Sequence, residues 1–233
     1  MGSETAHSTI QARKLLGMVL IRFIPAMIVL GAVLFIPAGT AEFWNAWLYL
    51  GLLVVLMTVA LSHLIIKDPA LLEKRMKLRE REPEQKKYIK TSIVFFILTF
   101  LVPGLDYRYQ WSAVPLWLVI LSSVLMACGY IMFFITMKQN TYASRVIEIQ
   151  EKQKVIDTGL YSIVRHPMYV AASILYLFSP IVLGSFYGII PMLLLPFLLA
   201  YRIRNEEDVL IKGLEGYKEY MQRVKYRLIP YVW

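Results

Sequence analysis

For its length, the sequence contains few cysteine, histidine and acidic residues. Its 233 residues include one cysteine, three histidines and 16 acidic side chains, against 25 Lys and Arg. The single cysteine, Cys128, excludes a disulfide within one chain, and its position in an apolar run predicts core packing rather than a nucleophile. No metal-ligand spacing and no Ser-His-Asp set is visible in the sequence, so we expect no metal site and no triad chemistry.

Charged residues are also scarce, and apolar residues are abundant. Hydrophobic residues make up 58% of the chain, whereas soluble domains contain about 45–50%. This predicts an integral membrane protein that is all-α, a polytopic helix bundle. A crossing takes about 20 apolar residues, and three of the apolar runs reach that length. Including the shorter runs, we expect five to six transmembrane segments, drawn from Leu15–Ile36, Phe43–Ile66, Ile93–Pro103, Val114–Met137, Val170–Leu183 and Phe186–Ala200.

The net charge of +9 is unevenly distributed between the connections of these runs. Lys and Arg concentrate between 67 and 90, between 138 and 165, and after 201, whereas the intervening connections hold only Arg108. This is the positive-inside pattern, so the charge indicates membrane orientation and contact with anionic lipid rather than nucleic-acid binding. The basic connections, and any site that they form, are expected to face the cytoplasm.

Two regions are expected along the chain. Residues 1–137 would hold the N-terminal transmembrane helices, with a helix near 69–87 that begins at Asp68-Pro69 and lies in the membrane interface. Residues 138–233 begin with a polar loop, in which the segment 155–159 has an extended pattern ending in a turn. The ordinary reading of that loop is a solvated connector, although such a loop can also place backbone groups against a ligand.

Two polar clusters near the C-terminus flank a long uncharged stretch. The first ends with Arg165-His166-Pro167-Met168-Tyr169, and the second runs from Arg202 to Asp208. About 32 residues separate them, which is about 50 Å of helix, too long for one crossing of a bilayer core of about 30 Å. A hairpin that turns near Gly184-Ser185 fits better and returns the second cluster to the face that the first one left. We therefore expect an arginine, a histidine and two glutamates to meet there.

The chemistry of these clusters has more than one interpretation. Proline favours the first turn of a helix, so His166 would lie at a helix start, where an interfacial anchor is the simpler role. Glu206 and Glu207 follow two arginines as the hairpin leaves the membrane. A carboxylate there could bind a cationic ligand or a hydroxyl group, or pair with the arginines, and an arginine could hold a carboxylate or phosphate.

The joint pattern resembles the isoprenylcysteine carboxyl methyltransferase and phospholipid methyltransferase superfamily. The matching residues are Thr-Gly-Leu-Tyr at 158–161, Arg-His-Pro-Met-Tyr at 165–169, the apolar hairpin, Arg202 with Glu206-Glu207, and the pair Tyr217 and Tyr220. The likeness covers about residues 138–233, and the N-terminal runs match only in being apolar. Leu160 replaces the family's usual proline, and Ala171 stands where a glycine is common, which puts the fine loop geometry in question more than the cofactor.

The resemblance implies a membrane methyltransferase that uses S-adenosylmethionine in a cytosolic pocket, most simply for carboxyl methylation of an isoprenylcysteine-like substrate. Carried over residue by residue, it assigns catalytic roles to Arg202, which would orient the methyl acceptor, and to Glu207. The expected cofactor-binding residues are Gln153, Lys154, Val155, Ile156, Gly159, Leu160, Tyr161, His166, Pro167, Met168, Tyr169 and Glu206.

Alternatives remain open from the sequence. An NADPH-dependent membrane reductase of the sterol or steroid type has a related C-terminal layout and an ending like residues 226–231, and a non-catalytic scaffold or transporter is a third reading. The acceptor is also open among a prenylcysteine carboxylate, a phospholipid amine, and another lipophilic acid or thiol. A carboxylate needs no general base, whereas an amine would need one, from Glu207 or His166.

Overall fold

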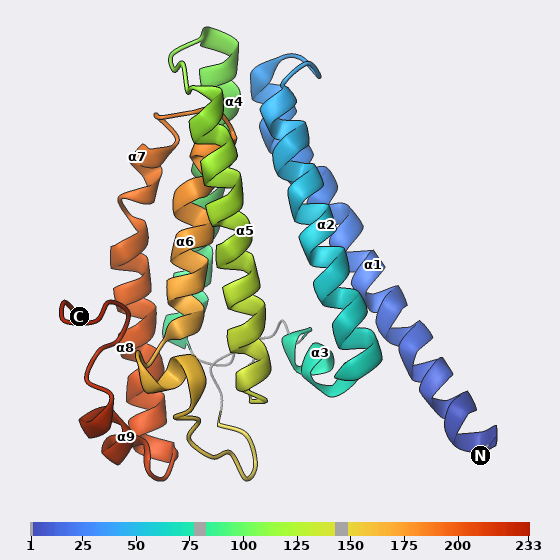
Figure 1. Cartoon of the computed structure of the whole chain (residues 1–233), viewed down its shortest axis with the longest axis vertical. Helices are drawn as coiled ribbons and strands as arrows, with labels where there is room; N and C mark the ends of the chain where they lie inside the picture. Colours follow the sequence, from blue (N-terminus) through green and yellow to red (C-terminus); the bar gives the residue numbers. More distant parts are fainter. Residues whose placement is uncertain (1, 77–82, 143–148) are drawn as a thin grey trace.

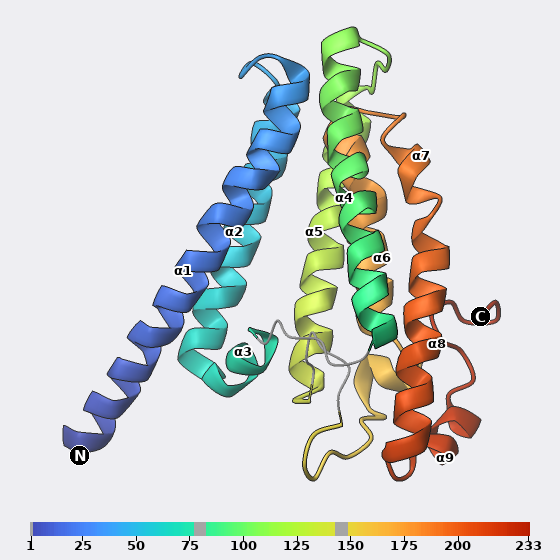
Figure 2. The same cartoon turned by 180° about the vertical axis from the view of Figure 1, so that it is seen from behind.

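The computed structural model describes residues 2–76, 83–142 and 149–233, and the regular secondary structure of this part of the chain is helical. The elements in order are α1 (Gly2–Ala38), α2 (Trp44–Lys67), α3 (Pro69–Arg75), α4 (Pro83–Tyr109), α5 (Leu116–Gln139), the 3₁₀ turn η1 (Gly159–Ser162), α6 (Pro167–Val182), α7 (Ile189–Met192), α8 (Leu195–Gly213) and α9 (Tyr217–Arg223). The long helices run roughly side by side, and α1 and α2 form a pair that leans away from the others at its lower end (Figures 1 and 2).

Four of the described helices are long and apolar enough to cross a membrane: Leu15–Ala38, Trp44–Lys67, Thr91–Tyr109 and Leu116–Gln139. The helix Pro167–Val182 is apolar but shorter. Large apolar side chains cover the outside of these helices; Ile21 and Ile36 of α1 are 75% and 74% exposed, respectively. So much exposed apolar surface suits lipid rather than water. The apolar run Ile93–Pro103, which looked short in the sequence, lies within α4, and this helix extends beyond the run at both ends.

The predicted hairpin is present, and its turn lies where the sequence placed it. Helix α6 ends at Val182, Gly184 has a left-handed φ of 75°, and Ser185 is fully buried. A glycine suits this conformation because it has no Cβ to clash. The chain then returns beside α6 through α7 and α8 (Figure 1). The returning arm is interrupted between α7 and α8, close to Pro191 and Pro196.

The predicted interfacial helix is shorter than expected. Asp68 caps α3 by accepting a hydrogen bond from the Leu71 N–H at 3.0 Å, and Pro69 occupies the first turn, as the sequence indicated. The helix ends at Arg75. Residues 77–82 lie outside the described residues, and 83–87 belong to the start of α4. Leu71 and Leu72 are buried against α1, α2 and the end of α5, so α3 packs into the bundle.

Helices α5 and α6 pack closely and support the first polar cluster. A Cβ added to Gly129 would lie 3.0 Å from the Ile174 methyl carbon, 3.0 Å from the Leu175 nitrogen and 3.2 Å from the Ala171 carbonyl oxygen. Ala171 itself is fully buried. The close approach therefore persists although α6 carries alanine where the family often has glycine, because α5 supplies a glycine opposite it.

The sequence-based prediction for Cys128 is wrong. Its side chain is exposed on α5, while the neighbouring Gly129 faces α6. An apolar run does not reveal which of its residues face other helices, because lipid and protein neighbours both favour apolar side chains.

Candidate active site

The residues of the second polar cluster are divided between two faces of α8. Leu199, Ile203 and Glu207 recur every four residues and are buried in the protein. Arg202, Glu206 and Leu210 follow the same spacing and line a pocket at the lower end of the bundle. Residues four apart share a helix face, whereas neighbours differ by about 100°. The adjacent glutamates therefore point to different surroundings.

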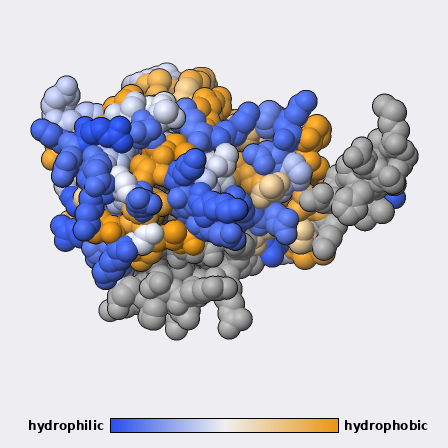
Figure 3. Space-filling view, turned by 90° about the horizontal axis from the view of Figure 1, so that it is seen from below, coloured by the Kyte–Doolittle hydropathy of each residue, from blue (hydrophilic) through white to orange (hydrophobic). Residues whose placement is uncertain are grey.

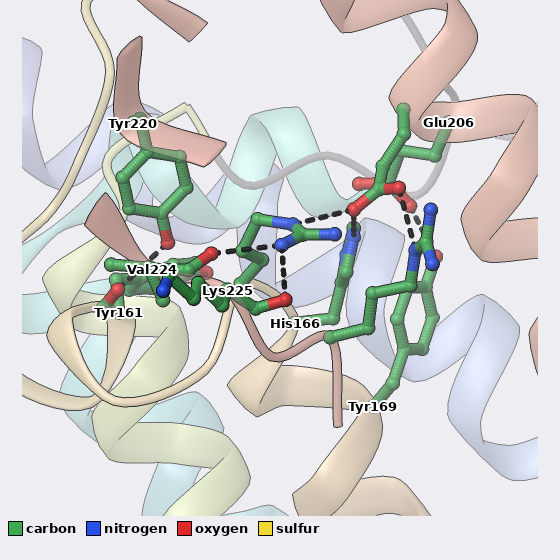
Figure 4. Close-up of polar contacts among 10 residues, drawn as sticks. Tyr161, His166, Tyr169, Glu206, Tyr220, Val224 and Lys225 are labelled. Atoms are coloured by element: carbon green, nitrogen blue, oxygen red, sulfur yellow. Dashed lines mark hydrogen bonds and ion pairs between the residues drawn. The ribbon is translucent and has the colours of Figure 1, made fainter. Parts of the chain in front are cut away.

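Arg202 and Glu206 are connected through a tyrosine of the first cluster. The Nε of Arg202 donates to the hydroxyl oxygen of Tyr169 at 2.8 Å, and this hydroxyl donates to Oε2 of Glu206 at 2.6 Å. Tyr169 lies in the first turn of α6, close to the ring of His166, at 5.7 Å between ring centroids. Figure 4 shows the two clusters meeting at this point.

Glu207 is the centre of a buried ion cluster. Its Oε1 accepts hydrogen bonds from Nε of Arg165 at 2.7 Å and Nε2 of His166 at 3.2 Å, and its Oε2 accepts from Nε of Arg227 at 2.7 Å. The Glu207 side chain is 3% exposed. Burial raises the pKa of Glu207, but the hydrogen bonds from His166 and Arg165 outweigh it and lower the pKa to about 2. A carboxylate only accepts, so His166 carries a proton on Nε2.

The C-terminal segment is bound to this cluster through its backbone. The Arg165 N–H donates to the Tyr226 carbonyl at 2.9 Å, and the His166 N–H donates to the Arg227 carbonyl at 3.0 Å. The Arg165 guanidinium adds bonds to the carbonyls of Val224 and Lys225, both at 2.8 Å (Figure 4). Arg165 and His166 thus hold the C-terminal segment against the start of α6.

The other side of the pocket is formed by the loop before α6. Its wall includes the segment 153–156, which has no helix or strand. The Gln150 side chain donates to the Tyr142 carbonyl at 2.7 Å, and the Gln150 N–H donates to the Gln153 side chain at 2.9 Å. Asn140, at the end of α5, donates to the Tyr161 hydroxyl at 3.3 Å. The loop is therefore held in place by its own hydrogen bonds.

The sequence between α5 and α8 matches a known family. Residues 118–212 match the sequence model of the isoprenylcysteine carboxyl methyltransferase family. The match covers less than half of the chain. It covers both polar clusters and the hairpin between them, so the resemblance read from the motifs is confirmed, and so is its implication of an enzyme that uses S-adenosylmethionine.

The whole chain also resembles a solved membrane protein structure. The structure of a eukaryotic intramembrane Ras methyltransferase, an isoprenylcysteine carboxyl methyltransferase, superposes with a TM-score of 0.54 at 19% sequence identity. The match covers 100% of this chain and 87% of the other. At this identity the likeness establishes the fold, and it extends the agreement to the N-terminal helices that the family model does not reach. No curated protein sequence matches the chain significantly.

Most of the site residues expected from the family motifs meet at this pocket. Of the residues expected from the sequence, those that line it are Arg202, Glu206, Gln153, Lys154, Val155, Ile156, Tyr161, His166, Met168 and Tyr169. Gly159, Leu160, Pro167 and Glu207 do not. Gly159 has a left-handed φ of 59° and starts η1, and Pro167 starts α6, so these two shape the backbone that carries their neighbours.

Several lining residues were not predicted as site residues: Asn140, Tyr142, Arg165, Leu210, Leu214, Tyr217 and Tyr220. Leu210 could have been found from the four-residue spacing after Arg202 and Glu206. Tyr217 and Tyr220 belong to the family pattern, but the sequence assigned no role to either of them. Tyr220 donates to the Tyr161 carbonyl at 2.7 Å, and burial raises the pKa of Tyr161 to about 12, so the Tyr161 phenol stays neutral.

The residues of the pocket suit S-adenosylmethionine, which combines an aromatic base, sugar hydroxyls and a zwitterionic amino-acid end. Tyr161, Tyr217 and Tyr220 offer aromatic surface, and the 153–156 backbone offers amide groups. The Glu206 carboxylate is half-buried at the pocket wall. An ionised carboxylate accepts several hydrogen bonds, so Glu206 can hold a hydroxyl or ammonium group in addition to the Tyr169 hydroxyl.

Proposed function

We propose that this protein is a membrane-embedded, S-adenosylmethionine-dependent methyltransferase that methylates the carboxylate of an isoprenylcysteine-like acceptor. The family match of residues 118–212 supports this reaction over a sterol-type reductase or a scaffold. All residues that line the pocket lie between 140 and 220, which supports assigning cofactor binding and catalysis to residues 138–233. The N-terminal helices would then supply the membrane side of the acceptor site.

One observation carries the proposal: Arg202 and Glu206 share one face of α8 at the pocket wall and are joined through Tyr169. A cationic and an anionic side chain one turn apart can hold two different ligands next to each other. Glu206 would hold the hydroxyl or ammonium groups of the cofactor, with Tyr161, Met168 and the 153–156 segment around it. Arg202 would hold the anionic acceptor by charge-assisted hydrogen bonds.

The proposed chemistry places few demands on the protein. S-adenosylmethionine, when bound, supplies an electrophilic methyl group on a sulfonium. A carboxylate acceptor is already a nucleophile, so the side chains need only align it and exclude water. We assign Glu207 a positioning role in place of the catalytic one expected from the sequence. Hydrogen bonds from His166, Arg165 and Arg227 keep the pKa of Glu207 far below neutrality, so it is a poor proton acceptor at pH 7.

The proposed orientation places the pocket on the cytoplasmic side. The lower end of the bundle, where the pocket lies, is largely hydrophilic (Figure 3), and the basic residues Lys67 and Lys138 end two of the spans there. The opposite ends of the spans carry Arg108 as their basic residue in the described part of the chain. Lys and Arg favour the cytoplasmic side, and anionic lipid would accompany them.

Purified protein in lipid nanodiscs provides the test. We expect it to bind S-adenosylhomocysteine and to transfer radiolabelled methyl groups to an S-farnesylcysteine analogue with a free carboxylate. The same analogue with its carboxyl group converted to an amide is the matched control and should stay unlabelled. Labelling of phospholipid amines without labelling of any carboxylate would refute the proposed acceptor, and binding of NADPH in place of S-adenosylhomocysteine would refute the reaction class.

A further inference from the structure

The hydroxyl group of Tyr169 has an unusual position between the two charged residues of the pocket wall. It accepts from Arg202 and donates to Glu206, at 2.8 Å and 2.6 Å. These directions are fixed by chemistry. A guanidinium only donates and an ionised carboxylate only accepts, so the group between them must do both. A phenol hydroxyl meets this requirement, and phenylalanine, which has the same ring, does not.

The ring that carries this hydroxyl is held from the α6 side. The Tyr169 N–H donates to the His166 carbonyl at 3.0 Å, and the His166 imidazole donates to Glu207 in the buried ion cluster. On its other side the ring packs in the apolar cluster of α4 and α8 that includes Leu199 and Ile203. The hydroxyl is therefore presented to α8 from a rigid support, independent of the two side chains that it contacts.

We propose that the Tyr169 hydroxyl is a positioning group that couples the cofactor and acceptor halves of the site. The inference rests on the proposed function, in which Glu206 serves the cofactor and Arg202 the acceptor. One hydroxyl fixes the rotamers of both side chains, since each must point at the same oxygen. Its loss removes one hydrogen bond from each charged side chain at once, so that binding on both sides weakens together.

The test compares Tyr169→Phe with the wild-type protein in two measurements. The first is calorimetric binding of S-adenosylhomocysteine, which needs no turnover, and the second is the KM for the farnesylcysteine acceptor at saturating cofactor. Because the hydroxyl bonds to two charged side chains, we expect both the dissociation constant of S-adenosylhomocysteine and the KM of the acceptor to rise about tenfold or more. Tyr130→Phe is the control: it removes a hydroxyl from α5, outside the pocket lining, and should change neither constant.

A double variant tests whether the hydroxyl acts through Glu206. In a Glu206→Gln background, Tyr169→Phe should weaken S-adenosylhomocysteine binding by less than threefold, because the partner carboxylate is already gone. A full tenfold effect in that background would overturn the coupling. So would a Tyr169→Phe protein in which only one of the two constants has changed.

The failure of this inference and the failure of the proposed function give different results. A wild-type protein that neither binds S-adenosylhomocysteine nor methylates a carboxylate overturns both. A wild-type protein that does both, together with a Tyr169→Phe variant that matches it in both constants, overturns only the role of the hydroxyl.

Discussion

The replacement Glu207→Gln separates the roles of two adjacent glutamates. In the native protein three donors converge on the Glu207 carboxylate, two on Oε1 and one on Oε2. Glutamine has one acceptor oxygen and one amide nitrogen, so at least one of Arg165, His166 and Arg227 would face a donor. The variant also leaves two buried or half-buried guanidinium groups without the compensating negative charge.

The expected loss of stability is large because the cluster is buried. Removing one partner of a buried ion pair costs about 3–5 kcal/mol, and about 1 kcal/mol shifts the Tm of a chain of this size by about 2–4 °C. We therefore expect the Tm of Glu207→Gln to fall by about 6 to 20 °C. Glu206→Gln, the same change one residue earlier, keeps an amide oxygen that can accept from the Tyr169 hydroxyl. It should therefore lower the Tm by less than about 4 °C.

The measurement is the temperature at which detergent-solubilised protein loses its monodisperse peak in fluorescence-detected size exclusion. Asp157→Asn is a second control, because its partner Arg223 is 63% exposed and ion pairs at the surface contribute about 0–1 kcal/mol. The reasoning is refuted if Glu207→Gln melts within 2 °C of the wild type, or if Glu206→Gln loses as much stability as Glu207→Gln.

Three further predictions concern the pH dependence of stability, the packing of α5 on α6, and the roles of Glu206 and Arg202. Glu207 has a pKa of about 2 in the folded protein against an ordinary value of 4.5. The ionised Glu207 therefore stabilises the folded protein fully above pH 4.5, and this contribution is lost as the pH falls toward 2. The Tm of Glu207→Gln should vary less over this range than that of the wild type. Gly129→Leu should lower the Tm by forcing α5 from α6, whereas Gly51→Leu, where nothing lies within 4 Å, should not. Glu206→Gln should weaken S-adenosylhomocysteine binding more than tenfold, while Arg202→Ala should abolish methyl transfer with at most a few-fold change in that affinity; equal losses of affinity in both variants would contradict the division of roles.

Much of the fold could be predicted because membrane helices leave a strong signal in the sequence. Long apolar runs gave the four candidate spans of the described residues. The count is below the five to six expected, because the last two runs lie in the shorter helix α6 and in the interrupted arm of α7 and α8. The excess length between the two polar clusters gave the hairpin and its turn at Gly184. His166-Pro167 marked the start of α6. The length of α3 was overestimated, because Pro83 lies inside the predicted range 69–87 and begins α4 instead; proline favours the first turn of a helix.

The sequence alone determined that an arginine, a histidine and two glutamates would lie at one end of the bundle, since a hairpin returns its two ends to the same face. The family motifs added the cofactor. What only the tertiary structure decided is how these groups are distributed. Adjacent residues on a helix point about 100° apart, so Glu206 faces the pocket and Glu207 faces Arg227, which follows it by 20 residues. Contacts of that kind depend on the packing of the tail against α6 and α8, and hydrophobic pattern and charge do not encode them.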